Sequence, residues 1–206
     1  MHFPIYIIYL GLMLLMGLTH KSRYFIYTKT LCSIAFVTIA CLTKGLGYLF
    51  GIAMAFFALG DFLLVFKREK MKHGIIAFIV GNLVMIGIFS LYLKLMPYQF
   101  ILPVVAMILL TTLDEKGIVV LEEDRPYVFV YSFILALAFS STVVMAVTYN
   151  HPFFNVLALG YGLYFVSDLF ELAYVYVPAS PKWIGAIVLT LYYIGMLLIA
   201  LSVMLA

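Results

Sequence analysis

The chain contains 206 residues, of which 67% are hydrophobic and 10% are charged. A soluble domain has about 45–50% apolar and about 25% charged residues, so this composition excludes a soluble enzyme and a disordered chain. The net charge of +3 comes from 12 lysines and arginines that form no basic stripe, which excludes a nucleic-acid-binding module. The sequence therefore predicts an integral membrane protein. Its expected partner is the lipid bilayer, and we expect no binding of nucleic acid.

The charged residues divide the chain into long apolar runs. A helix needs roughly 20 apolar residues to cross the bilayer, and the runs are continuous rather than alternating, which excludes a porin-like barrel. We predict one all-α domain over residues 1–206, a bundle of eight transmembrane helices. Their expected ranges are 2–18, 24–43, 46–66, 75–93, 99–113, 126–148, 154–177 and 183–205.

The fifth run is the weakest of the eight. It has about 15 residues before Asp114, Glu115 and Lys116 interrupt it, which is short for a spanning helix. A seven-helix protein with a re-entrant fifth segment is therefore an alternative. Residues 117–121 are expected to form an interfacial turn.

The lysines and arginines of the connections are strongly asymmetric. Lys44 and Lys94 lie on one side of the predicted bundle, and nine basic residues lie on the other. Basic connections face the cytoplasm, so both termini are expected on the outer face of a bacterial cytoplasmic membrane. The nine are Lys21, Arg23, Lys67, Arg68, Lys70, Lys72, Lys116, Arg125 and Lys182.

The two halves of the chain show a weak similarity to each other. Asp61 and Asp168 are 107 residues apart, and at that offset residues 58–62 align with 165–169. Two halves with an even number of helices would be parallel repeats. The sequence is thus compatible with two parallel four-helix repeats, each with one aspartate inside a helix.

Four charged residues lie within the predicted helices: Lys29, Asp61, Asp168 and Glu171. Each costs roughly 2.5–3.5 kcal/mol in mid-membrane, and such residues usually face the bundle interior and pair. They lie in the cytoplasmic half, as does Asn82, the one amide of the fourth helix. Two interpretations follow, a structural pair between Lys29 and a carboxylate or a functional site with a buried carboxylic acid.

Several other kinds of active site find no support. The histidines, His2, His20, His73 and His151, lie in connections or at helix ends, so no intramembrane zinc site is indicated. The chain has no G-x-S-x-G elbow and no phosphate-binding P-loop. We therefore expect neither a metal nor a cofactor.

Short motifs occur in order along the chain. Residues 58–64, ALGDFLL, contain a G-D-x-x-L element, and residues 165–168, FVSD, contain an F-x-S-D element. Lys29 lies early in the second helix, and Tyr131 lies early in the sixth. With the eight-helix layout, these features resemble the YhhN-like family, the bacterial relatives of lysoplasmalogenase. Asn82 departs from the pattern, since many relatives carry a histidine there.

This resemblance implies hydrolysis of the vinyl ether bond of lysoplasmalogens, lysophospholipids that yield a fatty aldehyde and a glycerophospho-ethanolamine or -choline. Vinyl ethers hydrolyse through an oxocarbenium ion, and glycosidases handle a related ion with two carboxylates. Asp61 and Asp168 are the expected catalytic pair, with their acid and base roles open. The expected supporting residues are Lys29, Asn82, Tyr131, Tyr164, Ser167 and Glu171.

Two other functions stay open at this stage. A small proton-coupled transporter would also carry intramembrane carboxylates and parallel repeats. Such a transporter would need a second polar layer near the outer face, where the sequence offers little beyond Lys44 and Lys94. A non-catalytic lipid-binding protein would use the charges as a structural ion pair. None of these features specifies an oligomeric state.

Overall fold

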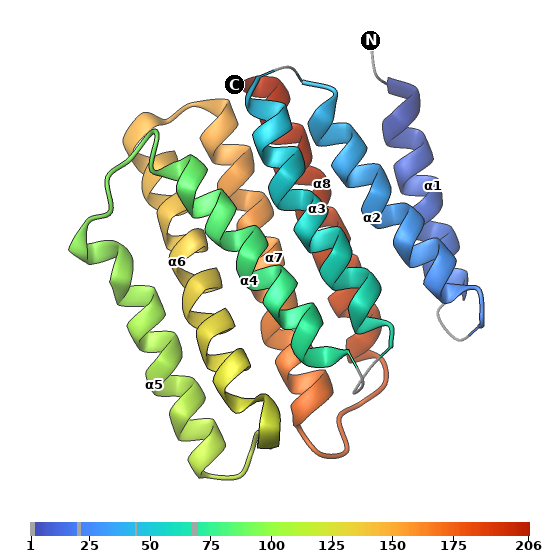
Figure 1. The fold of residues 1–206 in the computed structure, drawn as a ribbon, viewed down its shortest axis with the longest axis vertical. Coiled ribbons are helices and arrows are strands. Elements are labelled where there is room, and N and C mark those ends of the chain that lie inside the picture. Colours follow the sequence, from blue (N-terminus) through green and yellow to red (C-terminus); the bar gives the residue numbers. More distant parts are fainter. Residues whose placement is uncertain (1–2, 20–21, 44, 67–69) are drawn as a thin grey trace.

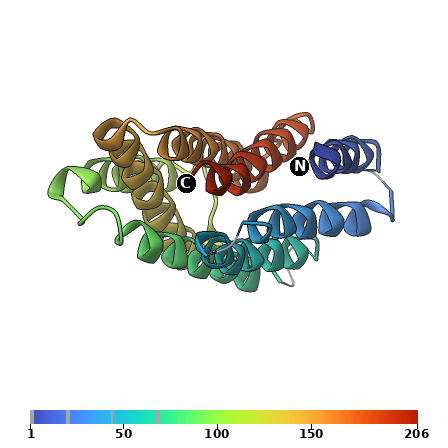
Figure 2. The ribbon, with the colours of Figure 1, turned by 90° about the horizontal axis from the view of Figure 1, so that it is seen from above.

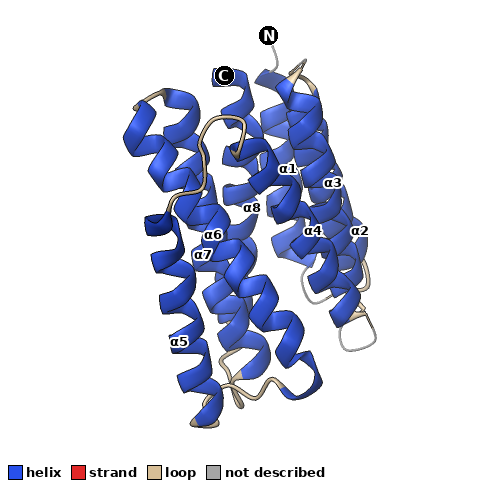
Figure 3. Cartoon of the chain, turned by 60° about the vertical axis from the view of Figure 1, so that its left-hand side comes forward, coloured by secondary structure: helices blue, strands red, loops and turns tan. Residues whose placement is uncertain are grey.

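The computed structural model describes residues 3–19, 22–43, 45–66 and 70–206, and this part of the chain is built of helices and loops (Figure 3). It contains the eight α-helices that the apolar runs predict. They are α1 (Phe3–Thr19), α2 (Phe25–Cys41), α3 (Leu46–Leu64), α4 (Met71–Phe89), α5 (Ile101–Glu115), α6 (Arg125–Tyr149), α7 (Pro152–Tyr176) and α8 (Ile184–Ser202). Short 3-10 helices η2 (Pro97–Phe100), η3 (Glu122–Asp124) and η4 (Val203–Leu205) adjoin α5, α6 and α8.

Length and composition support a multi-pass membrane protein. Six helical segments in the described ranges are long and apolar enough to cross a bilayer, whereas α1 and α2 are apolar but shorter. The fourth helix was expected over 75–93, yet α4 begins at Met71 and ends at Phe89. Hydropathy misplaces it because the helical hydrogen bonds continue into the polar first turn, while the apolar residues Leu91 and Tyr92 are exposed in a turn.

The fifth segment forms one continuous helical stretch. The 3-10 helix η2 continues directly into α5, so that Pro97–Glu115 is one helical segment long enough to span. Figure 1 shows α5 beside α6 along the outer edge of the bundle. Few of its side chains are buried, which explains why its sequence looks less like that of a core helix.

Six helices form a closed ring. In order of contact they are α2, α3, α4, α6, α7 and α8, and α8 returns to α2. Figure 2 shows α2, α3 and α4 in one row and α7 and α8 in the other, with α6 bridging the two. Outside the ring, α1 packs on α2 and α5 packs on α6. Each contact within the first four helices therefore has a counterpart within the last four, and the α2–α8 contact corresponds to the α6–α4 contact.

Close helix approach holds this ring together. A Cβ atom on Gly160 of α7 would lie 2.9 Å from the backbone oxygen of Gly195 on α8. A Cβ atom on Gly81 of α4 would lie 2.5 Å from the ring of Phe57 on α3. Glycine is thus required at these crossings, because small residues let membrane helices pack backbone to backbone.

The C-terminal ends of α1, α3, α5 and α7 lie at one end of the bundle. The N-terminal end of α1 and the C-terminus of the chain lie at the other end (Figure 1). Arg125 pairs with Asp114 at 2.8 Å, and Lys72 pairs with Glu123 at 2.7 Å, at the connection from α5 to α6. Val119, which lies within this connection in the predicted interfacial turn, is buried. The basic end is therefore also a packed end, where α4, α5 and α6 are joined.

Candidate functional site: two carboxylates in one helix ring

The intramembrane charges predicted from the sequence converge inside the ring. Asp61 comes from α3, Lys29 from α2, and Asp168 and Glu171 come from α7. The Asp61 side chain is 3% exposed and that of Lys29 is 12% exposed. Asp168 and Glu171 are half-buried. Asp168 is near enough to Asp61 and Glu171 for their charges to act on it.

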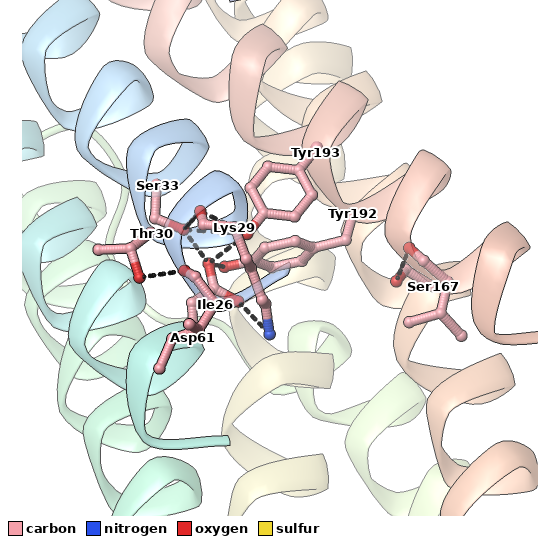
Figure 4. A network of polar contacts seen from close by, with 9 residues as sticks. Ile26, Lys29, Thr30, Ser33, Asp61, Ser167, Tyr192 and Tyr193 are labelled. Atoms are coloured by element: carbon pink, nitrogen blue, oxygen red, sulfur yellow. Dashed lines mark hydrogen bonds and ion pairs between the residues drawn. The ribbon is translucent and has the colours of Figure 1, made fainter. Parts of the chain in front are cut away.

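Asp61 has a positive partner and several hydroxyl donors (Figure 4). The Lys29 Nζ atom lies 3.3 Å from Asp61 Oδ1. Asp61 Oδ2 accepts hydrogen bonds from Ser33 Oγ at 2.7 Å and from the Tyr192 hydroxyl at 3.0 Å, and the Tyr193 hydroxyl lies 3.4 Å away. A buried carboxylate is tolerated when an opposite charge and hydrogen bonds satisfy it. These groups all favour a negative charge on Asp61.

Local helix geometry explains how these donors meet. Lys29 and Ser33 are four residues apart and therefore share one face of α2. Tyr192 and Tyr193 are adjacent in α8, the helix that closes the ring against α2. The backbone oxygen of Tyr193 also accepts a hydrogen bond of 2.7 Å from the hydroxyl of Tyr9 on α1. The outer helix α1 thus fixes the part of α8 that contacts Asp61.

Asp168 has a different set of partners. Its Oδ2 atom accepts a short hydrogen bond from the Tyr131 hydroxyl of α6. The hydroxyls of Tyr131 and Tyr164 are 2.8 Å apart, and Asn82 Nδ2 of α4 donates to Tyr164 at 3.1 Å. This chain of neutral groups connects α4, α7 and α6.

No lysine or arginine in the described ranges forms an ion pair with Asp168. Its nearby charges are the carboxylates of Glu171 and Asp61, which repel a negative charge on Asp168. Glu171 itself makes no hydrogen bond to another residue that the structure describes, although the charge of Lys29 acts on it. The two aspartates are therefore unequal: the surroundings compensate a charge on Asp61 more fully than one on Asp168.

Aromatic rings pack between the surroundings of Asp61 and those of Asp168. The ring of Tyr192, which contacts Asp61, packs edge-on against Tyr164 with centroids 5.6 Å apart. Tyr164 also packs against Phe57 at 5.7 Å, and Phe78 packs against Tyr131 at 6.0 Å. The surroundings of Asp61 and Asp168 are thus joined by a layer of aromatic rings. Electrostatic interactions in such surroundings are stronger than in water.

Most of the expected supporting residues contact a catalytic candidate or its partners. Lys29 contacts Asp61, and Tyr131, Tyr164 and Asn82 form the chain that ends at Asp168.

Two expected supporting residues, Glu171 and Ser167, make no hydrogen bond to either aspartate. The Ser167 hydroxyl donates to the backbone oxygen of Val188 at 3.0 Å, and Figure 4 shows it apart from the Asp61 cluster. Ser167 and Asp168 point in different directions, because consecutive helical residues are about 100° apart around the helix axis. The structure therefore places the Ser167 hydroxyl against α8, and its expected supporting role stays a prediction.

Ser33, Tyr192 and Tyr193 were not predicted from the sequence, because hydroxyl groups in helices are too common to stand out as charged groups do. Two signals were present in hindsight. Ser33 lies one helical turn after Lys29, and the two tyrosines interrupt an otherwise apolar helix.

Comparison with known proteins gives one match. The profile of the YhhN family matches residues 24–203. No curated protein and no solved structure matches the chain. Within the described ranges, no three His, Cys, Asp or Glu side chains are grouped so that they could hold a metal ion.

Proposed function

Because the chain belongs to the YhhN family, we propose that it is a membrane-embedded hydrolase that cleaves the vinyl ether bond of lysoplasmalogens. The products are a fatty aldehyde and glycerophospho-ethanolamine or -choline. One observation carries this proposal: two inward-facing aspartates share a helix ring. Asp61 is paired with Lys29, whereas Asp168 accepts a hydrogen bond from Tyr131. Acid-catalysed ether hydrolysis needs such an unequal pair, one carboxyl protonated and one ionised.

The chemistry assigns a step to each group. A carboxylic acid gives its proton to the outer carbon of the vinyl ether double bond, which leaves a carboxylate and an oxocarbenium ion. Water then adds to the carbon next to the ether oxygen and gives up one proton to the carboxylate. The resulting hemiacetal breaks its bond to the glycerol oxygen, which takes the hydroxyl proton, and the aldehyde leaves. The sum is the addition of one water molecule.

The unequal surroundings support one assignment of the roles. Asp168 is the acid, because its partners are neutral hydroxyls and its neighbouring charges are negative. Asp61 stays ionised beside Lys29 and stabilises the positive charge of the oxocarbenium ion. Fixed charges that face a developing charge in a water-poor site are among the strongest catalytic effects known.

The surroundings of the pair fit a lipid substrate. A lysophospholipid has one hydrocarbon chain, which can enter between helices from the bilayer. Glu171 and Lys29 lie near the carboxylate pair and provide charges for a zwitterionic head group. We also propose that the basic end faces the cytoplasm of a bacterium, so that both termini lie outside.

The direct test uses the purified protein in detergent with lysoplasmenyl-ethanolamine as the substrate, and it measures the release of aldehyde. Asp61→Asn and Asp168→Asn should each abolish release while the protein elutes as a folded species. Glu123→Gln is the matched control, because Glu123 is an exposed carboxylate whose side chain is 86% accessible. Full activity in either aspartate variant would refute the mechanism, and an inactive wild type would refute the substrate.

A proton-coupled transporter is the second candidate, and one observation favours it. The contacts of α2, α3 and α4 recur in α6, α7 and α8, as in carriers built from parallel repeats. Uptake of lysolipid into proteoliposomes, dependent on a proton gradient, would support this function. Aldehyde release without a gradient would exclude it as the main activity.

A further inference from the structure

Asn82 has a buried amide group whose orientation is fixed by its neighbours. The residue is fully buried, and its Nδ2 atom donates to the backbone oxygen of Phe78 at 3.0 Å and to the Tyr164 hydroxyl at 3.1 Å. Its Oδ1 atom has no hydrogen-bond partner among the described residues. A backbone oxygen can only accept, so the amide nitrogen must face Phe78 and hence also Tyr164.

This orientation gives the hydroxyl chain a direction. An amide nitrogen cannot accept a hydrogen bond, so the Tyr164 oxygen receives a proton from Asn82. The single proton of Tyr164 is then given to Tyr131, 2.8 Å away. Tyr131 gives its own proton to Oδ2 of Asp168. Each donor is used once, and the chain ends on one oxygen of one carboxyl group.

The opposite direction would leave a buried donor without a partner. If Asp168 donated a proton from Oδ2 to Tyr131, only one of the two tyrosine hydroxyls could donate across their 2.8 Å contact. The proton of the other hydroxyl would have no acceptor among the described residues. Tyr164 is fully buried, and an unsatisfied buried donor is strongly disfavoured. Asn82 therefore selects the direction that ends at Asp168.

We propose that Asn82 is a positioning residue that acts through Tyr164 and Tyr131 to keep Oδ2 of Asp168 an acceptor, so that the transferable proton is carried on Oδ1. This inference rests on the proposed ether hydrolysis. When Oδ1 gives its proton to the vinyl carbon, the new carboxylate already accepts a hydrogen bond from Tyr131. The donor is in place before the charge develops, which is the arrangement that lowers a barrier most effectively.

Turnover by three substitutions at position 82 tests this inference. Asn82→Leu removes the donor at similar volume, and Asn82→Asp replaces it with an acceptor. Both should lower kcat by roughly 10- to 100-fold, less than the 10²- to 10⁴-fold typical of losing the acid or base itself, while KM changes less than about threefold. Asn82→His restores an N–H donor and should raise kcat at least about tenfold above Asn82→Leu, because the direction of the chain is recovered.

A double-substitution cycle separates positioning from general stability. Tyr164→Phe keeps the ring packing and removes the hydroxyl through which Asn82 acts. In that background, Asn82→Leu should lower kcat no further, because residues that act through one another are not additive. Additive losses, or a wild-type kcat in Tyr164→Phe, would overturn the proposal even if Asn82→Leu folds poorly.

Infrared spectroscopy provides a readout that does not depend on turnover. The carbonyl stretch of a protonated Asp168, identified by its loss in Asp168→Asn, reports the hydrogen bond at Oδ2. This carbonyl stretch should move to higher wavenumber in Asn82→Asp, because the hydrogen bond from Tyr131 to Oδ2 is then weakened or lost. An unchanged band would overturn the proposed direction. A wild type that releases no aldehyde would instead refute the ether hydrolysis, and the band would still decide the direction.

Discussion

Asp61 and Asp168 occupy matching places in the two halves of the ring, yet their surroundings differ in kind. Lys29, Ser33 and Tyr192 surround Asp61 with a cation and hydroxyl donors. Asp168 ends a relay of neutral groups and faces other carboxylates. Two aspartates at matching places in similar helix arrangements thus have unequal electrostatic surroundings, because the neighbouring side chains differ.

The largest expected effect comes from the acid itself. Asp168→Asn keeps the shape and the hydrogen bond from Tyr131 but removes the transferable proton. Aldehyde release should fall by about 10³-fold or more, near the upper range for general acids, while the Tm stays within a few degrees. Steady-state kinetics and thermal unfolding in detergent check this. An Asp168→Asn protein with more than a tenth of wild-type kcat would show that Asp168 is not the acid.

The next effect should be on stability and concerns Asp61. Lys29→Met leaves the buried carboxylate without its cation, which typically costs roughly 3–5 kcal/mol. The double variant Lys29→Met/Asp61→Asn should recover most of that loss, because it removes the uncompensated charge. Denaturant unfolding in mixed micelles measures both. A single variant as stable as wild type would mean that Asp61 does not carry the charge.

Removing one hydroxyl donor should have an intermediate effect. Tyr192→Phe keeps the packing against Tyr164 and loses the hydrogen bond of 3.0 Å to Asp61. A bond to a charged group contributes about 1.5–3 kcal/mol, so kcat should fall by roughly 10- to 100-fold if Asp61 stabilises the cation. Wild-type kcat in this variant would show that the remaining donors suffice without Tyr192.

Ser167→Ala should have the smallest effect. Ser167 bonds the backbone of α8 and neither aspartate, so the variant should lose about 0.5–1.5 kcal/mol of stability and keep kcat within about twofold. Parallel kinetics and unfolding measure the two quantities. A large loss of kcat at unchanged stability would show that Ser167 belongs to the site after all.

The sequence predicts the helices well because lipid imposes a simple rule of length and apolar composition. The same rule made Lys29 and Asp61 visible, since charges are rare in membrane helices. Neutral donors such as Ser33 and Tyr192 gave no comparable signal, because hydroxyls are tolerated in lipid at low cost. Ser167 bonds α8 although it precedes Asp168 in the motif, because a motif preserves neighbours along the chain, whereas contact depends on the helical phase.

The relative place of the two carboxylates also required the structure. Nothing in the spacing of Asp61 and Asp168 indicates that α8 packs against α2 and closes the ring. That contact is made by side chains from distant segments, such as Tyr193 of α8, whose ring lies 6.3 Å from that of Phe36 on α2. It brings Tyr192 to Asp61 and thereby makes the two aspartates unequal.

The inequality of the two aspartates can be measured directly by infrared spectroscopy of the resting protein at neutral pH. A protonated carboxyl stretch should be present in the wild type, be lost in Asp168→Asn and persist in Asp61→Asn. A band that persists in Asp168→Asn and is lost in Asp61→Asn would contradict this prediction, because the acid would then be the aspartate paired with Lys29.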